Sequence, residues 1–162
     1  MTFHFLQWRG KRHPGSTLAK PAAAVWSAVC LCACSFAPQT SIPSCPVRLE
    51  RNAAVIGCLA PGSWWRIEKA KYAVDRIGYG GVLVVNAFDG NYYAFDLACP
   101  VEASPTVRVS SPDGALMVTC PRCGEEYYLG DGLGLPQKGI SSFSLLRYQT
   151  SCTAAATLYV SN

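Results

Sequence analysis

The sequence has very little histidine and little charge. Its only two histidines, His4 and His13, lie near the N-terminus, and only 15% of the residues are charged. A Ser-His-Asp catalytic arrangement needs a histidine, and no phosphate-binding loop pattern occurs along the chain. No substrate site of an enzyme can therefore be identified, and we expect a carrier or binding module rather than a catalyst.

The net charge of +4 has a local origin. Arg9, Lys11, Arg12 and Lys20 precede residue 21, and no acidic residue does. The remaining chain holds ten basic and ten acidic residues, so it is neutral overall. Nucleic-acid binding through a basic surface is therefore not expected.

The first 37 residues have the layout of an export signal. A polar, basic stretch over 1–20 precedes an apolar run over 21–37, which is shorter than the roughly 20 residues of a membrane span. Leu31-Cys32-Ala33-Cys34 resembles the lipobox of bacterial lipoproteins, and this resemblance implies a signal peptide over 1–33 and a lipid-modified Cys34. An ordinary signal peptide or a buried apolar helix are the alternatives. We expect a membrane-anchored protein of the bacterial cell envelope. By resemblance to lipoprotein sorting, Ser35 rather than Asp after the cysteine allows transfer to the outer membrane.

Cleavage before Cys34 has a chemical consequence. The 129 residues from Cys34 onward contain no histidine, so a histidine-ligated metal is excluded in the mature chain. Residues 34–46 are rich in proline and hydroxyl side chains, and we expect an extended tether there. Residues 47–162 form the expected domain, a single one by its size.

Short apolar and aromatic runs separated by turn residues predict an all-β, antiparallel sandwich or barrel. Asn52 is expected to cap a short helix that reaches Leu59. Asp89-Gly90 predicts a hairpin turn between two strands. The expected strands are 47–50, 63–68, 82–86, 92–96, 106–110, 116–119, 127–129, 144–149 and 155–160.

Two Cys-Pro loops follow two of these strands. Cys99-Pro100-Val101-Glu102 is separated by a further hairpin from Cys120-Pro121-Arg122-Cys123, with eighteen residues between Val101 and Cys120. Over about residues 80–150 this layout resembles the Rieske iron–sulfur domain, whose pattern is C-x-H followed by C-x-x-H. The chain is also similar to Rieske-like lipoproteins of Bacteroides-type bacteria. The resemblance implies two converging loops, a 2Fe-2S cluster and a one-electron carrier that serves an unidentified partner protein.

The ligand set departs from that family. Val101 stands at the first histidine position and has no donor atom, whereas Cys123 stands at the second and can ligate. The resemblance thus implies Cys99, Cys120 and Cys123 as metal ligands. A fourth ligand would come from Glu102, Cys58, Cys152, solvent or a small thiol, and carboxylate suits this cluster poorly. Zinc is an alternative metal.

A metal-free site is the competing hypothesis. Thiols of exported proteins become disulfides in oxidising compartments, so Cys99, Cys120 and Cys123 could be free or disulfide-bonded. The protein would then be a binding or structural lipoprotein that kept the fold and lost the cofactor. Six cysteines follow Cys34 and permit fifteen pairings, among which the sequence does not choose: Cys45, Cys58, Cys99, Cys120, Cys123 and Cys152.

Overall fold

The apolar runs become ten short strands in a computed structural model that describes residues 39–139 and 141–162. No helix occurs among these residues, and the all-β prediction is confirmed. The expected signal peptide and Cys34 lie outside the described residues. The strands are β1 (Val47–Asn52), β2 (Trp64–Ile67), β3 (Arg76–Ile77), β4 (Val82–Asn86), β5 (Tyr92–Asp96), β6 (Met117–Thr119), β7 (Glu126–Tyr128), β8 (Pro136–Lys138), β9 (Arg147–Cys152) and β10 (Thr157–Ser161).

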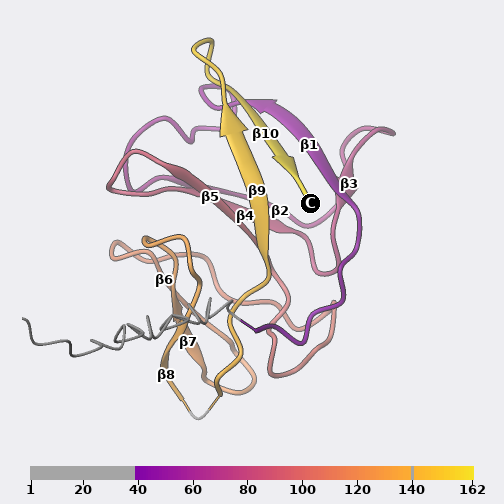
Figure 1. The fold of residues 1–162 in the computed structure, drawn as a ribbon, viewed down its shortest axis with the longest axis vertical. Coiled ribbons are helices and arrows are strands. Elements are labelled where there is room, and N and C mark those ends of the chain that lie inside the picture. The colour runs from indigo at the N-terminus through magenta and orange to yellow at the C-terminus, as the bar shows by residue number, and fades with distance from the viewer. Residues whose placement is uncertain (1–38, 140) are drawn as a thin grey trace, which may run out of the picture. The chain divides into compact units, whose positions relative to one another are not determined.

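The strands form two antiparallel sheets (Figure 1). Seven strands pair in the order β2-β4-β5-β9-β10-β1-β3, and three pair in the order β6-β7-β8. The β4–β5 hairpin turns at Asp89-Gly90 as predicted, with Gly90 at φ 81°. That left-handed conformation favours glycine, because it strains residues that carry a Cβ atom.

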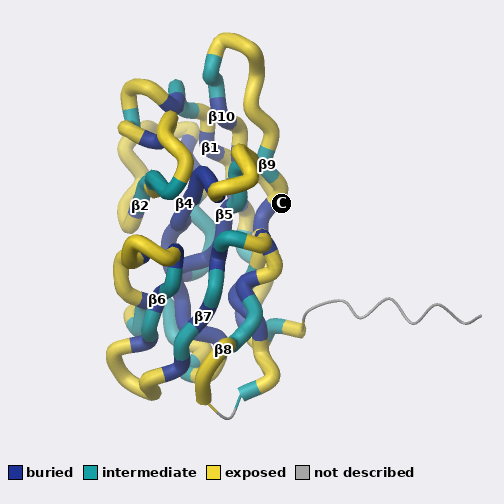
Figure 2. Tube along the Cα trace, turned by 90° about the vertical axis from the view of Figure 1, so that its left-hand side faces the viewer, coloured by how far each residue is buried: buried dark blue, intermediate teal, exposed yellow. Residues whose placement is uncertain are grey.

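Strand β4 is buried along its whole length because it lies between two cores. Side chains alternate across a strand, so Leu83 and Val85 enter one core while Val82 and Val84 enter the other. The first core is shared with β6 and β7 and includes Cys99 and Cys120. The second lies inside the seven-stranded sheet, against side chains of β1, β9 and β10. Figure 2 shows this buried path through the middle of the domain.

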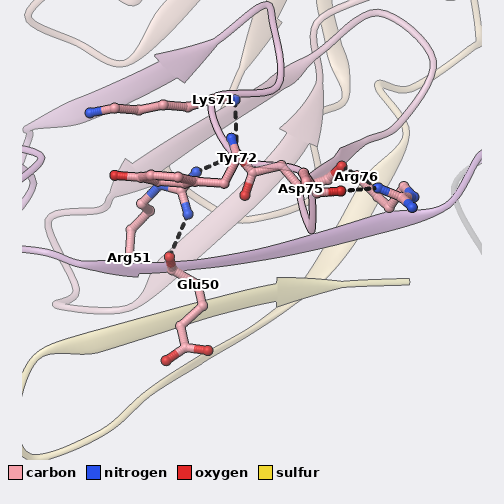
Figure 3. A network of polar contacts seen from close by, with 7 residues as sticks. Glu50, Arg51, Lys71, Tyr72, Asp75 and Arg76 are labelled. Carbon is pink, nitrogen blue, oxygen red and sulfur yellow. Dashed lines mark hydrogen bonds and ion pairs between the residues drawn. The ribbon is translucent and has the colours of Figure 1, made fainter.

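A charged cluster fixes the loop that leads into β3 (Figure 3). The guanidinium of Arg51 donates to the Asp75 carboxylate at 2.6 Å and lies 4.7 Å from the centre of the Tyr72 ring. The amides of Lys71 and Tyr72 donate to the same carboxylate, each at 2.9 Å. Burial alone would raise the pKa of Asp75, but these donors together hold it below its ordinary value. The Asp75 carboxylate therefore has its hydrogen-bond donors, and the cluster holds the loop before β3 in place.

Two local predictions are wrong. Residues 53–57 form turns instead of a helix: Asn52 Oδ1 accepts from the amide of Ala54 at 3.0 Å, but Gly57 at φ 71° reverses the chain after one turn. Residues 106–110 form no strand beyond a single bridge between Ala98 and Arg108. Their neighbour is the segment that bends away from β5 to present Cys99, so a continuous ladder cannot form. The sequence also gave no indication of the short strands β3 and β8.

Within the described part of the chain, no helix has the length and apolar character that crossing a membrane requires.

Candidate metal centre

The first cysteine loop leaves the end of β5 and is positioned by Asp96. This fully buried carboxylate accepts from the amides of Gly80 at 2.9 Å and Ala98 at 2.7 Å. It also accepts from the amide of Tyr79 at 2.8 Å and from the Tyr148 hydroxyl at 2.6 Å. A buried carboxylate needs hydrogen-bond donors in place of water, and Asp96 has four of them. They fix the backbone directly before Cys99.

The two cysteine loops share one backbone geometry. The Ala103 amide donates to the Cys99 carbonyl at 2.9 Å, and the Gly124 amide donates to the Cys120 carbonyl at 3.0 Å. Both donors have a left-handed backbone, with φ of 45° at Ala103 and 76° at Gly124. Each loop therefore closes four residues after its first cysteine, which leaves the intervening amides free to point inward.

Three thiols converge where the loops meet. The sulfur atoms of Cys99, Cys120 and Cys123 all lie within 4.8 Å of one another. Those of Cys99 and Cys123 are 3.6 Å apart, and the Tyr127 hydroxyl lies 3.8 Å from Cys99 Sγ. Cys99 and Cys120 are buried, whereas Cys123 is exposed. The site thus has two buried donors and one that reaches the surface.

Backbone amides act on all three sulfur atoms. Burial would raise the pKa of Cys120, but the amides of Cys123 and Arg122, together with the neighbouring thiols, lower it below the ordinary value. Burial raises the pKa of Cys99 to about 12, against the opposing effect of the Glu102 and Val101 amides. Burial also raises the pKa of Cys123, which the Glu125 amide opposes. Cys120 is therefore the thiol that ionises first.

The donor set fits a thiolate-bound metal but not the histidine-containing set of the Rieske pattern. Metal–sulfur bonds of about 2.3 Å in a tetrahedron place sulfur atoms about 3.8 Å apart, close to the 3.6 Å between Cys99 and Cys123. Val101 is 42% exposed and offers no donor atom. The Glu102 carboxylate is 3.1 Å from the Arg122 guanidinium, an ion pair that occupies it. Among the described residues, the protein supplies three ligands here.

The remaining described cysteines lie elsewhere. Cys58 is buried in the second core, its thiol 3.7 Å from the Ser63 carbonyl. Cys152 is exposed at the end of β9, and Cys45 is half-buried. None of them belongs to the three-thiol group, and all six described cysteines are free. Neither Cys58 nor Cys152 is placed to supply the fourth ligand.

Comparison with known proteins gives structural neighbours only. No protein-family model matches the chain, and no curated protein matches it. The chain is similar to the NADH-dependent nitrite reductase small subunit from Mycobacterium tuberculosis, at 19% identity and a TM-score of 0.44, over 72% of this chain and 96% of that one. It is also similar to the ferredoxin of carbazole 1,9a-dioxygenase from Nocardioides aromaticivorans IC177, at 19% identity and a TM-score of 0.43, over 71% and 95%.

A third neighbour is the complex of reduced oxygenase and oxidised ferredoxin in carbazole 1,9a-dioxygenase, at 18% identity and a TM-score of 0.42 over 62% of this chain and 90% of that one. Identities this low identify no shared function. The functional hypothesis therefore depends on the residues of the site itself.

The structure brings together the three cysteines that the sequence predicted and leaves Val101 and Glu102 outside the sulfur group. Sequence reasoning missed the contact between Tyr127 and Cys99, because Tyr127 was expected only as part of a strand over 127–129. It also missed the Arg122 partner of Glu102. No local sequence signal indicates the contact of Tyr127: it is the buried residue of β7, but the side chain it meets depends on how the loops pack.

Proposed function

We propose that this domain is a one-electron carrier with an iron–sulfur centre bound by Cys99, Cys120 and Cys123. The observation that carries the proposal is the convergence of three thiols at two loops of the same geometry, with backbone amides opposing the burial of each sulfur atom. Isolated buried thiols need no such support, whereas metal-bound thiolates are stabilised by it. A cluster here would supply reversible one-electron transfer, at a lower potential than with histidine ligands.

The chain's own residues would bind and shield the centre. Tyr127, buried beside Cys99, offers a hydroxyl donor to a thiolate. The first core covers the Cys99 and Cys120 side and excludes water from it. Cys123 stands on the exposed side, where a fourth ligand from solvent or a small thiol could enter. We therefore propose that electrons leave on the Cys123 side, toward a partner protein.

The second candidate is a metal-free binding or structural protein. The specific observation in its favour is the 3.6 Å approach of the Cys99 and Cys123 sulfur atoms, from which a disulfide can form with a small side-chain movement. Such a bond would join the two loops without a metal. It would also remove two of the three ligands, so the two hypotheses exclude each other in one molecule.

Anaerobic purification of the full chain distinguishes these hypotheses. The carrier predicts iron and sulfide in equal amounts, together with visible absorption that reduction bleaches. Replacing Cys123 with serine should remove most of both signals, while the matched variant Cys152→Ser, at an exposed cysteine outside the site, should keep them. A colourless protein with a Cys99–Cys123 disulfide by mass spectrometry would support the metal-free hypothesis instead. Zinc without iron would support a zinc site.

We further propose that the protein is a lipoprotein of the bacterial cell envelope, anchored to the outer membrane through Cys34. The basic start, the short apolar run and the lipobox-like residues that end at Cys34 support this location. Metabolic labelling with a fatty acid should mark the wild-type chain and not Cys34→Ser. Labelling that persists in the variant would remove the basis of this proposal.

A further inference from the structure

The described chain begins with a segment that is attached to the first cysteine loop. We call residues 39–42 the strap. The Gln39 carbonyl accepts from the Ser144 amide at 2.7 Å and from its hydroxyl at 3.0 Å. The Ser41 hydroxyl donates to the Pro100 carbonyl, directly after Cys99, and Ile42 is buried. The point where the chain enters the domain is therefore fixed beside the thiol site.

Exposed apolar side chains adjoin the strap at each contact. Val101 follows Pro100 and is 42% exposed, and Phe143 precedes Ser144 and is 39% exposed. Leu133, 41% exposed, lines an open cavity of about 220 Å³ together with Thr40 of the strap. We call Val101, Leu133 and Phe143, with residues 39–42, the strap face. Its apolar side chains come from three loops, each of which contacts or borders residues 39–42.

Charge on and around the strap face is balanced. Arg122 is paired with Glu102 beside Val101. Arg147 borders the same cavity as Leu133, and the Asp131 carboxylate accepts from the Leu133 amide at 2.8 Å. An attraction carried by net charge is therefore not expected. Contact through this face would be apolar and only weakly dependent on salt.

We propose that the strap face lies on the surface of the membrane that carries the Cys34 lipid. This inference rests on the lipid anchor of the proposed function and is independent of the cluster. Four residues lie between Cys34 and Gln39, so the Cα atoms of these two residues are at most about 18 Å apart. A domain of about 120 residues is about 35 Å across, so the anchor cannot reach a face on the far side. The end that bears the strap is therefore the part of the domain that the anchor holds nearest to the lipid surface.

The consequence concerns the partner of the thiol site. Because Val101 belongs to the loop that carries Cys99, a strap face on the membrane holds the thiol site close to the lipid surface. The partner would then be a membrane protein or a carrier that moves within the membrane plane. The turn between β9 and β10, at the opposite end of the domain in Figure 1, would point away from the membrane.

Amide hydrogen exchange on the mature chain lipidated on Cys34 tests this inference. The protein is placed in vesicles of phosphatidylethanolamine and phosphatidylglycerol at a 3:1 ratio and compared with the same protein in detergent. Exchange over 97–104, 130–134 and 141–147 should slow about fivefold or more in vesicles. Exchange over 53–60 should not change, since Ala53 pairs with Ala156 at the β9–β10 turn.

A pair of double variants sharpens the test. Leu133→Asp with Phe143→Asp should abolish the slowing, whereas Val55→Asp with Val74→Asp, at exposed apolar residues off the strap face, should preserve it. Urea unfolding of both variants checks that the fold is intact.

Several results would overturn the inference. They are no slowing in vesicles, slowing over 53–60 instead, or slowing that survives Leu133→Asp with Phe143→Asp. Protection that rises with protein concentration without vesicles would assign the face to a second copy of the chain. A chain without lipid on Cys34 also overturns it. Iron analysis of the same sample keeps the tests separate, because a colourless protein with slowed exchange supports the strap face and refutes only the carrier.

Discussion

The hydrogen bond between Tyr148 and Asp96 should contribute measurably to stability, and Tyr148→Phe removes it with little other change. The ring stays in place, so no large cavity forms. The lost donor stood 2.6 Å from a carboxylate that is fully buried, and Tyr148 itself is 2% exposed, so water cannot readily replace it. Hydrogen bonds to charged groups contribute about 1.5–3 kcal/mol. Because three backbone amides still donate to the Asp96 carboxylate, we expect a loss of stability in the lower part of this range, about 2 kcal/mol.

Equilibrium urea unfolding of the reduced protein, followed by circular dichroism, measures this loss. With a denaturant slope of about 2 kcal/mol per molar, the midpoint should fall by about 1 M and the slope should not change. The matched control is Tyr159→Phe, because Tyr159 is 40% exposed and its hydroxyl lies 3.5 Å from Glu50 Oε1. Its effect should stay within about 0.5 kcal/mol. Equal effects of the two variants, or a loss below 0.5 kcal/mol for Tyr148→Phe, would refute the assigned role of Asp96.

Three further predictions concern the site and its support. Gly80→Ala should destabilise the domain by about 1–3 kcal/mol in urea unfolding and lower metal retention, because a Cβ there would lie 2.6 Å from the Ala98 amide nitrogen; Gly114→Ala, with open space around it, should be neutral, and equal losses would contradict this. Because burial raises the pKa of Cys99 to about 12, the Cys99 thiol stays protonated in the folded state at pH values where it ionises in the unfolded state. The urea midpoint of the reduced, metal-free protein should therefore fall as the pH rises from 9 toward 12, and a constant midpoint would refute this. Val101→His should increase iron per protein and raise the reduction potential, since it adds a nitrogen donor beside Cys99; unchanged iron and potential would argue against the proposed centre.

Much of the fold was predictable because its signals are local. The β4–β5 hairpin follows from Asp89-Gly90 between two apolar runs, and β4 was recognised from its unbroken apolar composition. The helix expected after Asn52 failed because a capping residue alone does not sustain a helix. The segment 53–57 closes on Ala156, a residue about a hundred positions later, and local pattern contains no such information.

The candidate site was likewise predictable only in part. Cys99, Cys120 and Cys123 were predicted because the spacing of the two Cys-Pro loops resembles the Rieske pattern, which implies that the loops converge. That Glu102 pairs with Arg122 was not predictable, because the two residues belong to different loops. The proximity of Tyr127 to Cys99 likewise depends on how β7 packs against the end of β5.

The sequence by itself determined the all-β class, the residues at the loop tips and the absence of histidine after Cys34. These properties depend on residue identity and on short-range periodicity, which a single chain displays directly. Only the tertiary structure decided that three sulfur atoms lie within 4.8 Å, that Cys58 and Cys152 lie elsewhere, and that residues 39–42 attach beside Pro100. Those facts depend on contacts between residues far apart in the sequence, and such contacts are fixed when the two cores pack together.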